Sequence, residues 1–254
     1  MAVSLFGGRR PLRPILGTQA TSQVAREVRT EDELRQALQP LDTSSTASLV
    51  GNTGRRIIIT APITLKAPVI IDASLPGTII EANGYLPIIC GADGIDAFVV
   101  KAVRCTLSGL FFTSATAGGA ATIGEFLTCV RVETTGDFCR ILDCETFDCD
   151  SFAVVDVGAL QGIIRGCIIG KTVATADCIT IDAARWRVEC NHLDAASGVS
   201  VVVTANGTGT AIVGNDMGNN GITTSASAGL NTIFGNTRAG TITNHATDAV
   251  GLNT

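Results

Sequence analysis

The sequence contains few aromatic residues and few histidines. Its 254 residues include one tryptophan, one tyrosine, nine phenylalanines and two histidines. So few large rings argue against a wide aromatic-lined pocket and favour a narrow interior filled by small and β-branched side chains. His192 and His245 have no nucleophile or partner at a characteristic spacing, so neither predicts a catalytic acid or base.

Long apolar runs and an excess of positive charge are also missing. No apolar stretch reaches the roughly 18 residues of a transmembrane helix, and residues 1–16 lack the apolar centre of a signal peptide. The chain carries 18 basic and 23 acidic residues, a net charge of -5, whereas nucleic-acid-binding proteins normally have a basic face. These absences predict a soluble protein with no membrane insertion and no nucleic-acid partner.

Nine cysteines are present, but no two of them form a C-x-x-C pair. They are dispersed between Cys90 and Cys190, unlike the cysteines of zinc modules or disulfide-rich miniproteins. We therefore expect buried, reduced thiols, and we expect no metal and no cofactor. A metal cluster of Cys139, Cys144 and Cys149 is the alternative.

The N-terminal residues differ in composition from the rest of the chain. Residues 1–29 contain five arginines against one acid and few periodic apolar positions, which predicts an extended arm. A capping box, Thr30-Glu31-Asp32-Glu33, then predicts a helix over about residues 30–41 with Leu34, Leu38 and Leu41 on one face. This helix is suited to cover the open end of a stack of strands.

The remaining chain is a series of short β-branched runs separated by glycine and small polar residues. In its second half, a strand followed by Cys144, Cys167, Cys190, Asn215 or Asn236 recurs every 21 to 25 residues. A second series of strands lies between these in phase, from residues 152–156 to residues 242–245. Coils of about 20 residues without a helix are typical of a parallel β-helix, so these five residues should form one inward ladder.

The register is less regular in the first half. Two series of equivalent positions are predicted there, namely Ile59, Ile80 and Val100, and Ile70, Ile89 and Leu107. Residues 113–137 interrupt the repeat, and we expect them to leave the stack. The predicted fold is an all-β, right-handed, single-stranded parallel β-helix over residues 30–254, with the capping helix at its start and the arm before it.

The opening of the predicted β-helix resembles the pectate-lyase-like β-helix superfamily, and within it the trimeric tail-spike and tail-fibre proteins of bacteriophages. The matching segments are residues 30–41, Arg56-Ile57-Ile58-Ile59-Thr60-Ala61-Pro62-Ile63-Thr64-Leu65, and Val69-Ile70-Ile71-Asp72. The resemblance extends less specifically to about residue 245. It concerns the fold, and a fold does not by itself determine a function.

The resemblance implies a virion structural protein, assembled in the host cytoplasm, that attaches a bacteriophage to host surface glycans. The basic arm, through Arg9, Arg10 and Arg13, would dock to other virion proteins. The weakly charged residues 197–254 favour self-association, and we expect a homotrimer. A capsid decoration protein is an alternative with the same trimer.

The other alternative is a polysaccharide lyase or glycoside hydrolase, although the short, nearly bare coils favour a protein that is not an enzyme. Glycosidic cleavage generally needs two carboxylates, and Asp156 and Asp182 occupy equivalent positions on neighbouring coils. They are the candidate catalytic pair. Solvated corner residues are the competing interpretation.

Sugar binding suggests further candidates. Trp186, with Arg185 and Arg187 beside it, could stack on a sugar ring, or it could pack inside a coil corner; Tyr85 is the other large amphipathic aromatic. An acidic group consists of Asp143, Glu145, Asp148 and Asp150. If these carboxylates lie on one side of a strand, they could bind calcium or sugar.

Overall fold

The structure, a computed structural model, describes residues 25–39, 54–92, 94–114, 125–147, 149–172, 177–195, 198–218 and 220–254. These residues form short strands arranged in three parallel sheets, together with one helix, Glu31–Ala37 (α1). Sheet A contains Arg26–Val28 (β1), Arg56–Ile59 (β2), Ile79–Ala82 (β5), Thr106–Ser108 (β8), Arg140–Leu142 (β11), Ile163–Arg165 (β14), Arg187–Glu189 (β17), Ala211–Val213 (β20), Thr232–Phe234 (β22) and Ala249–Val250 (β24).

The other two sheets have fewer strands. Sheet B contains Ile63–Leu65 (β3), Pro87–Cys90 (β6), Phe111–Thr113 (β9), Glu145–Thr146 (β12), Ile168–Thr172 (β15) and His192–Ala195 (β18). Sheet C contains Val69–Ile71 (β4), Asp96–Val100 (β7), Phe126–Val132 (β10), Cys149–Val155 (β13), Ile179–Ile181 (β16), Val201–Val203 (β19), Ile222–Thr223 (β21) and Ile242–Thr243 (β23).

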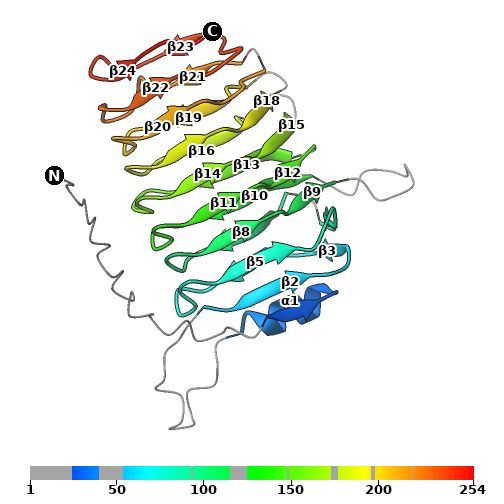
Figure 1. Cartoon of the computed structure of the whole chain (residues 1–254). Helices are drawn as coiled ribbons and strands as arrows, with labels where there is room; N and C mark the ends of the chain where they lie inside the picture. Colours follow the sequence, from blue (N-terminus) through cyan, green and yellow to red (C-terminus); the bar gives the residue numbers. More distant parts are fainter. Residues whose placement is uncertain are drawn as a thin grey trace, which may run out of the picture.

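From β2 to β19 the chain passes from sheet A to sheet B to sheet C in each coil, and neighbouring strands of each sheet pair in parallel. Figure 1 shows the coils stacked from α1 at one end to β23 and β24 at the other. The predicted all-β parallel β-helix is therefore confirmed. Beyond β18, isolated bridges from His192 to Asp216 and from Asp216 to Thr237 continue sheet B.

The interior is built from columns of side chains that repeat once per coil. The inward column of sheet A is fully buried and consists of Ile57, Ile80, Leu107, Ile141, Ile164, Val188, Ile212 and Ile233. Because side chains alternate along a strand, their neighbours on either side point outward. Burying each aliphatic side chain of this size contributes about 1.5 to 3 kcal/mol.

Four phenylalanines pack against one another in the interior. The ring of Phe112 lies edge-on to Phe98, Phe126 and Phe152, with centroid distances of 6.0, 6.2 and 6.4 Å. All four rings are fully buried. Edge-to-face pairs of this kind stabilise a core beyond the area that they bury.

The corner between sheets A and B repeats one unusual backbone conformation. Its residues have positive φ angles of 52° to 69° and are Gly109, Asp143, Gly166, Cys190, Gly214 and Gly235. The next residue in each coil points inward and is buried. Glycine adopts this left-handed conformation without steric cost, which explains why it occupies most of the corner.

The predicted ladder is wrong by one residue at Cys190. Cys190 is exposed and has a φ angle of 56°, so it belongs to the corner column. Asn191 takes the inward place, above Cys144 and Cys167, and the ladder continues through Asn215, Asn236 and Asn253. The other eight cysteines are buried and form no disulfide, as expected of reduced thiols; burial raises the pKa of the Cys105 thiol to about 11.

Hydrogen bonds join the asparagine ladder along the axis of the stack. The Nδ2 of Asn191 donates to Oδ1 of Asn215, and the Nδ2 of Asn215 donates to Oδ1 of Asn236, both at 2.9 Å. Each of these two Oδ1 atoms also accepts the backbone N–H of the preceding asparagine at 3.0 Å. The second proton of the Asn215 amide goes to the carbonyl of Val188, so these buried polar groups are paired.

Two predictions about the first half were wrong. Ile57, and not Ile59, pairs with Ile80, while Val100 lies in sheet C. In the second series, Ile70, Ile89 and Leu107 lie in sheets C, B and A respectively. Three similar β-branched runs occur in each coil, so spacing alone did not identify which runs are equivalent.

The segment predicted to leave the stack contains a full strand of it. Within residues 113–137, β10 pairs with β7 and β13, including Val130 with Phe98 and Ala153. Residues 115–124 lie outside the described part of the chain. The expected departure is therefore wrong for β10, which returns to sheet C in register.

The boundary between the arm and the β-helix also moves. Residues 26–28 form β1, which pairs with β2, so the β-helix begins before residue 30. Helix α1 is shorter than predicted, and its Leu34, Ala37 and Leu38 are buried in the common core. Leu41 lies outside the described residues. The Thr30 side chain accepts a hydrogen bond from the Glu33 backbone, as the capping box predicts.

The asparagine ladder yields a test of what holds the coils together. Replacing Asn215 by alanine should lower the free energy of unfolding by about 3 kcal/mol, because it leaves buried donors and acceptors on both sides unpaired. Urea unfolding followed by circular dichroism measures this. Asn244→Ala is the control, since Asn244 is exposed and donates only to its neighbour His245; equal losses would contradict a special role for the ladder.

Candidate functional site

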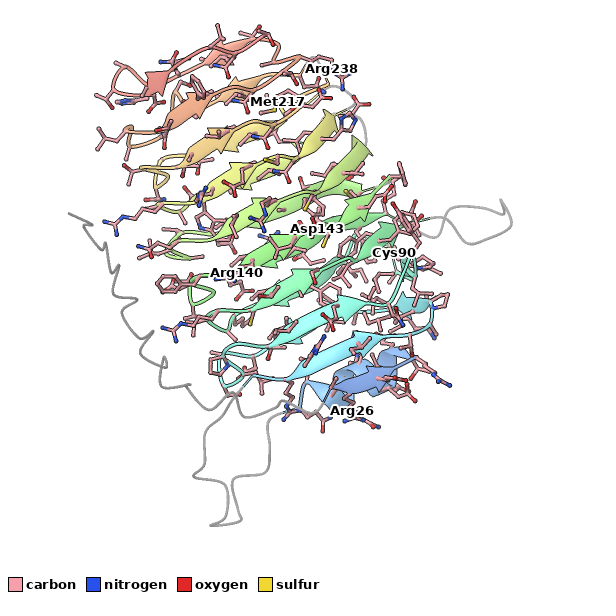
Figure 2. The ribbon with its side chains drawn as sticks, viewed as in Figure 1. Arg26, Cys90, Arg140, Asp143, Met217 and Arg238 are labelled. Carbon is pink, nitrogen blue, oxygen red and sulfur yellow. The ribbon has the colours of Figure 1, made fainter. Side chains whose placement is uncertain are left out.

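An open groove of about 860 Å³ lies along the outward face of sheet A. Its lining spans the coils of β5 to β17 and comprises Gly77, Ile79, Arg104, Thr106, Phe138, Cys139, Arg140, Leu142, Gln161, Gly162, Ile163, Arg165, Arg185 and Arg187. Five of these residues are arginines. Figure 2 labels Arg140 at the start of β11, on this side of the molecule.

The strand register brings the arginines together although they are far apart in sequence. Arg140 pairs with Ile163, which pairs with Arg187, so these two arginines lie two coils apart in one outward column. Arg165 lies in the neighbouring outward column, paired with Leu142 and Glu189. Consecutive strands are about 4.8 Å apart, so the cations form a closely spaced group.

The remaining arginines come from the corner that precedes sheet A. Arg104 and Arg185 have φ angles of 60° and 64°, and Phe138 and Gln161 occupy the same corner position with 57° and 59°. The guanidinium of Arg104 lies 5.9 Å from the centre of the Phe138 ring. Phe138 is about half exposed, so the groove offers an apolar edge next to its positive charge.

Most of the positive charge in the groove is not neutralised. Arg165 and Arg187 share Glu189, with shortest distances of 3.8 and 2.5 Å. In the part of the chain that the structure describes, Arg104, Arg140 and Arg185 form no hydrogen bond or ion pair through their side chains. The protein is acidic overall, yet this face is basic.

The predicted binding residues separate into two groups. Arg185 and Arg187 lie in the groove. Trp186 points inward, is fully buried, and donates from Nε1 to the carbonyl of Ala159 at 2.6 Å. Its ring fills the space over Gly162, where any Cβ would come within 2.1 Å of it. Of the two interpretations of Trp186, the structure agrees with packing inside a coil and not with sugar stacking, because the ring does not reach the surface.

Two arginines and a phenylalanine of the groove were missed in the sequence. Arg104, Arg140 and Phe138 lie in different runs and share no motif. The signal that could have found them is the spacing of one or two coils between Arg140, Ile163 and Arg187. That signal becomes visible only after the coil boundaries are known.

The candidate catalytic pair lies on another face. Asp156 and Asp182 directly follow the paired residues Val155 and Ile181 in sheet C, so they occupy adjacent coils as predicted. Burial raises the pKa of Asp156, despite the ion pair with Arg131 at 3.2 Å. Burial also acts on Asp182, but hydrogen bonds from Thr204 and Asn206 outweigh it and lower the pKa of this carboxyl.

Both carboxylates are engaged in contacts that hold the coils together. Arg131 joins Asp156 to Asp96, 2.8 Å away on the other side. Asp182 accepts from the backbone and the side chain of Asn206, both at 3.1 Å. Neither carboxylate lines the groove of sheet A. The geometry thus places the candidate pair apart from the arginines that could hold an acidic sugar.

The acidic group does not lie on one side of a strand as expected. Asp143 is at the corner, Glu145 is in sheet B and Asp150 is in sheet C; Asp148 lies outside the described residues. Among all the residues that the structure describes, no three His, Cys, Asp or Glu side chains are placed to hold a metal ion. The anchoring candidates Arg9, Arg10 and Arg13 also lie outside the described part of the chain.

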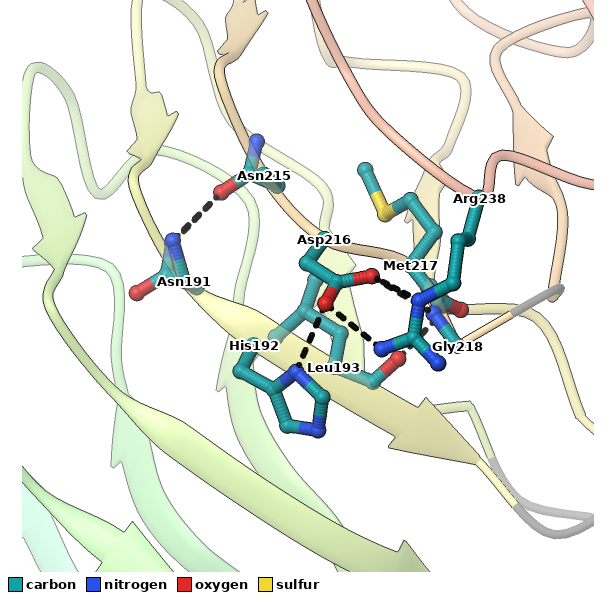
Figure 3. A network of polar contacts seen from close by, with 9 residues as sticks. Asn191, His192, Leu193, Asn215, Asp216, Met217, Gly218 and Arg238 are labelled. Carbon is teal, nitrogen blue, oxygen red and sulfur yellow. Dashed lines mark hydrogen bonds and ion pairs between the residues drawn. The ribbon is translucent and has the colours of Figure 1, made fainter. Parts of the chain in front are cut away.

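A polar network joins the last coils on the side of sheet B (Figure 3). His192 Nδ1 lies 3.1 Å from Asp216, and Arg238 contacts both oxygens of Asp216 at 2.6 and 2.5 Å. The hydrogen bond from Arg238, helped by that from His192, lowers the pKa of Asp216 to about 2. This network replaces the strand pairing of sheet B, which has only bridges here.

No helix in the described residues is long and apolar enough to cross a membrane. Fold and groove together define a β-solenoid protein with one basic face. Searches against protein-family models, curated proteins and solved structures found no match for the chain.

The lowered pKa of Asp216 predicts an acid-sensitive contribution to stability. Because the pKa in the folded protein lies below the ordinary value of 3.8, the ionised carboxylate stabilises the fold above about pH 4, and this contribution is lost as the pH falls towards 2. The difference in urea midpoint between the wild type and Asp216→Asn should therefore shrink over this range. Glu27→Gln, at an exposed position, is the control; a difference that stays constant with pH would contradict the assignment.

Proposed function

We propose that this chain is an attachment protein that binds an acidic polysaccharide along the groove of sheet A. The observation that carries the proposal is the presence of three arginines without acidic partners, Arg104, Arg140 and Arg185, in one open groove. Like charges held this close destabilise the free protein. An anionic ligand removes that cost.

The chemistry of the groove matches carboxylate or sulfate groups on a sugar chain. A guanidinium recognises such groups through two parallel hydrogen bonds. The arginines come from four successive coils, so they extend over roughly 14 Å at the strand spacing of parallel sheets. An extended polymer with repeated anionic groups fits that spacing, and the exposed edge of Phe138 suits the apolar face of a sugar ring.

Nucleic acid is the other extended polyanion that such a groove could meet. Proteins that bind single strands usually stack successive bases on several aromatic side chains. The lining contains only one aromatic residue, Phe138. The groove therefore favours a polysaccharide, and nucleic acid serves as a comparison ligand in the test.

The finer proposal is a bacteriophage tail spike or tail fibre that recognises host surface glycans as a homotrimer. The parallel β-helix and the arginine-lined groove support it. Residues 1–24, with Arg9, Arg10 and Arg13, would dock to another virion protein. In a capsid decoration protein, the groove would have no need to bind host polysaccharide.

Removing the unpaired arginines tests the proposed function. We expect Arg140→Gln and Arg185→Gln each to weaken binding of polygalacturonate or heparin by roughly fivefold, since an exposed charge contact contributes up to about 1 kcal/mol. Binding should also weaken as salt is added. Isothermal titration calorimetry on the full chain measures both effects.

The matched control is Arg56→Gln, on the same face of sheet A but outside the groove and paired with Glu81 at 2.7 Å. Equal losses for Arg56→Gln, or no binding of either polysaccharide, would contradict the proposal. Tighter binding of single-stranded DNA would replace it with a nucleic-acid function. If the polymer is shortened and Asp182→Asn stops this, the chain is a depolymerase with Asp156 and Asp182 as its acid and base.

The homotrimer is tested separately. Sedimentation equilibrium of the full chain should give a mass of about three times the 26.1 kDa of one chain, because cyclic assembly is a common way to bury weakly charged surface. Exposed apolar side chains near the C-terminal end, such as Leu230 and Leu252, are available for such contacts. A monodisperse monomer at micromolar concentration would contradict the trimer without affecting the groove.

A further inference from the structure

A second, smaller pocket lies at the corner between sheets A and B, apart from the groove. Its volume is about 240 Å³, and its lining consists of Ala82, Gly84, Tyr85, Gly109, Leu110, Phe111, Asp143 and Glu145. Figure 2 shows Asp143 beyond the end of β11 opposite to Arg140. Pockets for drug-sized ligands are typically about 300 to 1,000 Å³, so this one suits a small chemical group.

Aromatic rings form one side of the pocket. The rings of Tyr85 and Phe111 lie 6.0 Å apart at 60°, and Phe111 lies 5.8 Å from Phe147 at 76°. Tyr85 is 76% exposed and Phe147 is 47% exposed. In a chain so poor in aromatics, three rings in contact on the surface form a distinct apolar patch, and such patches mark binding sites more often than single exposed residues do.

Local backbone geometry presents the tyrosine to the pocket. Gly84 has a φ angle of 90°, a conformation that only glycine adopts readily. It precedes Tyr85 in the turn between β5 and β6. The strand register then places Phe111 next to Glu145 on the outward face of sheet B.

Two carboxylates face the same space without compensating charge. Asp143 and Glu145 line the pocket, and none of the described residues that line it is an arginine or a lysine. Within the described residues, neither carboxylate forms an ion pair. The pocket therefore combines negative charge with aromatic rings, whereas the groove is lined by arginines.

We propose that this pocket binds an organic ammonium group. A cation within about 6 Å of a ring centroid is attracted by the negative face of the ring, and neighbouring carboxylates strengthen the attraction. A neutral sugar could stack on the rings but would leave both carboxylates without a counterion. The primary amine of an amino sugar and the quaternary amine of a choline group share the required chemistry.

The chain offers a reporter at the site, because Tyr85 is its one tyrosine. Hydrogen bonding to Glu145 and the charge of that carboxylate raise the pKa of the Tyr85 phenol. A bound cation offsets that charge, so the pKa of Tyr85 should fall when the pocket is occupied. Tetramethylammonium is the probe for this readout, since its charge does not change with pH.

The experiment follows the ring signals of Tyr85 by NMR at neutral pH, and its phenolate absorbance at high pH, in the full-length chain. We expect tetramethylammonium to bind with millimolar affinity and to lower the pKa of Tyr85, while sodium at equal ionic strength does neither. A comparison of choline with glucosamine at neutral pH shows whether the pocket binds a quaternary or a primary amine. N-acetylglucosamine, which lacks the positive charge, should not bind.

Two variants keep the reporter and test the chemistry. Glu145→Gln removes the charge without changing the shape, and Phe111→Ala removes a ring; each should weaken tetramethylammonium binding by roughly fivefold or more. Glu27→Gln, on an exposed edge away from the pocket, should change nothing. If N-acetylglucosamine binds as well as glucosamine, or if no ammonium compound shifts Tyr85, the proposal is overturned. Neither result depends on the groove, whose arginines are unchanged in these variants.

Discussion

Backbone hydrogen bonding along the axis of the stack is the constraint on which the rest of the structure depends. The N–H of Ile163 donates to the carbonyl of Cys139, that of Arg187 to Gly162, and that of Ala211 to Trp186, all within 3.0 Å. A slip of one residue would turn every inward side chain of a strand outward. The register is therefore strongly specified, and it turns a periodic sequence into columns of side chains.

The same columns produce both the stable interior and the basic face. Inward, repetition lets asparagines bond to one another, which satisfies polar groups that would otherwise be costly to bury. Outward, repetition places charges close together. In sheet C, Arg131 lies between Asp96 and Asp156 and is neutralised by them. In sheet A, Arg140 has no such partner, and this difference between two faces of one scaffold is the physical basis of the proposed binding groove.

Structure could be predicted from the sequence where composition and period agree. Short β-branched runs separated by glycine and asparagine indicated the parallel β-helix, and the phase of Asp156 and Asp182 was correct because both follow the same run in successive coils. The prediction failed by one residue at Cys190, since a cysteine in the left-handed conformation at the corner looks like the inward cysteine of the neighbouring coils. For Trp186 the sequence left stacking on a sugar and packing inside a coil both open, and packing is what the structure has, because Gly162, one coil earlier, makes room for the ring.

By itself, the sequence determined the fold class, the length of the coil and the start of the helix at Thr30, because these follow from local periodicity and capping. Only the tertiary structure decided which surfaces are chemically distinct. Arg104 and Arg187 are 83 positions apart in the chain. Tyr85 and Glu145 are also far apart in the sequence and share no motif. They share sites because parallel stacking places equivalent residues of successive coils only about 4.8 Å apart, and that proximity depends on a register that no single segment encodes.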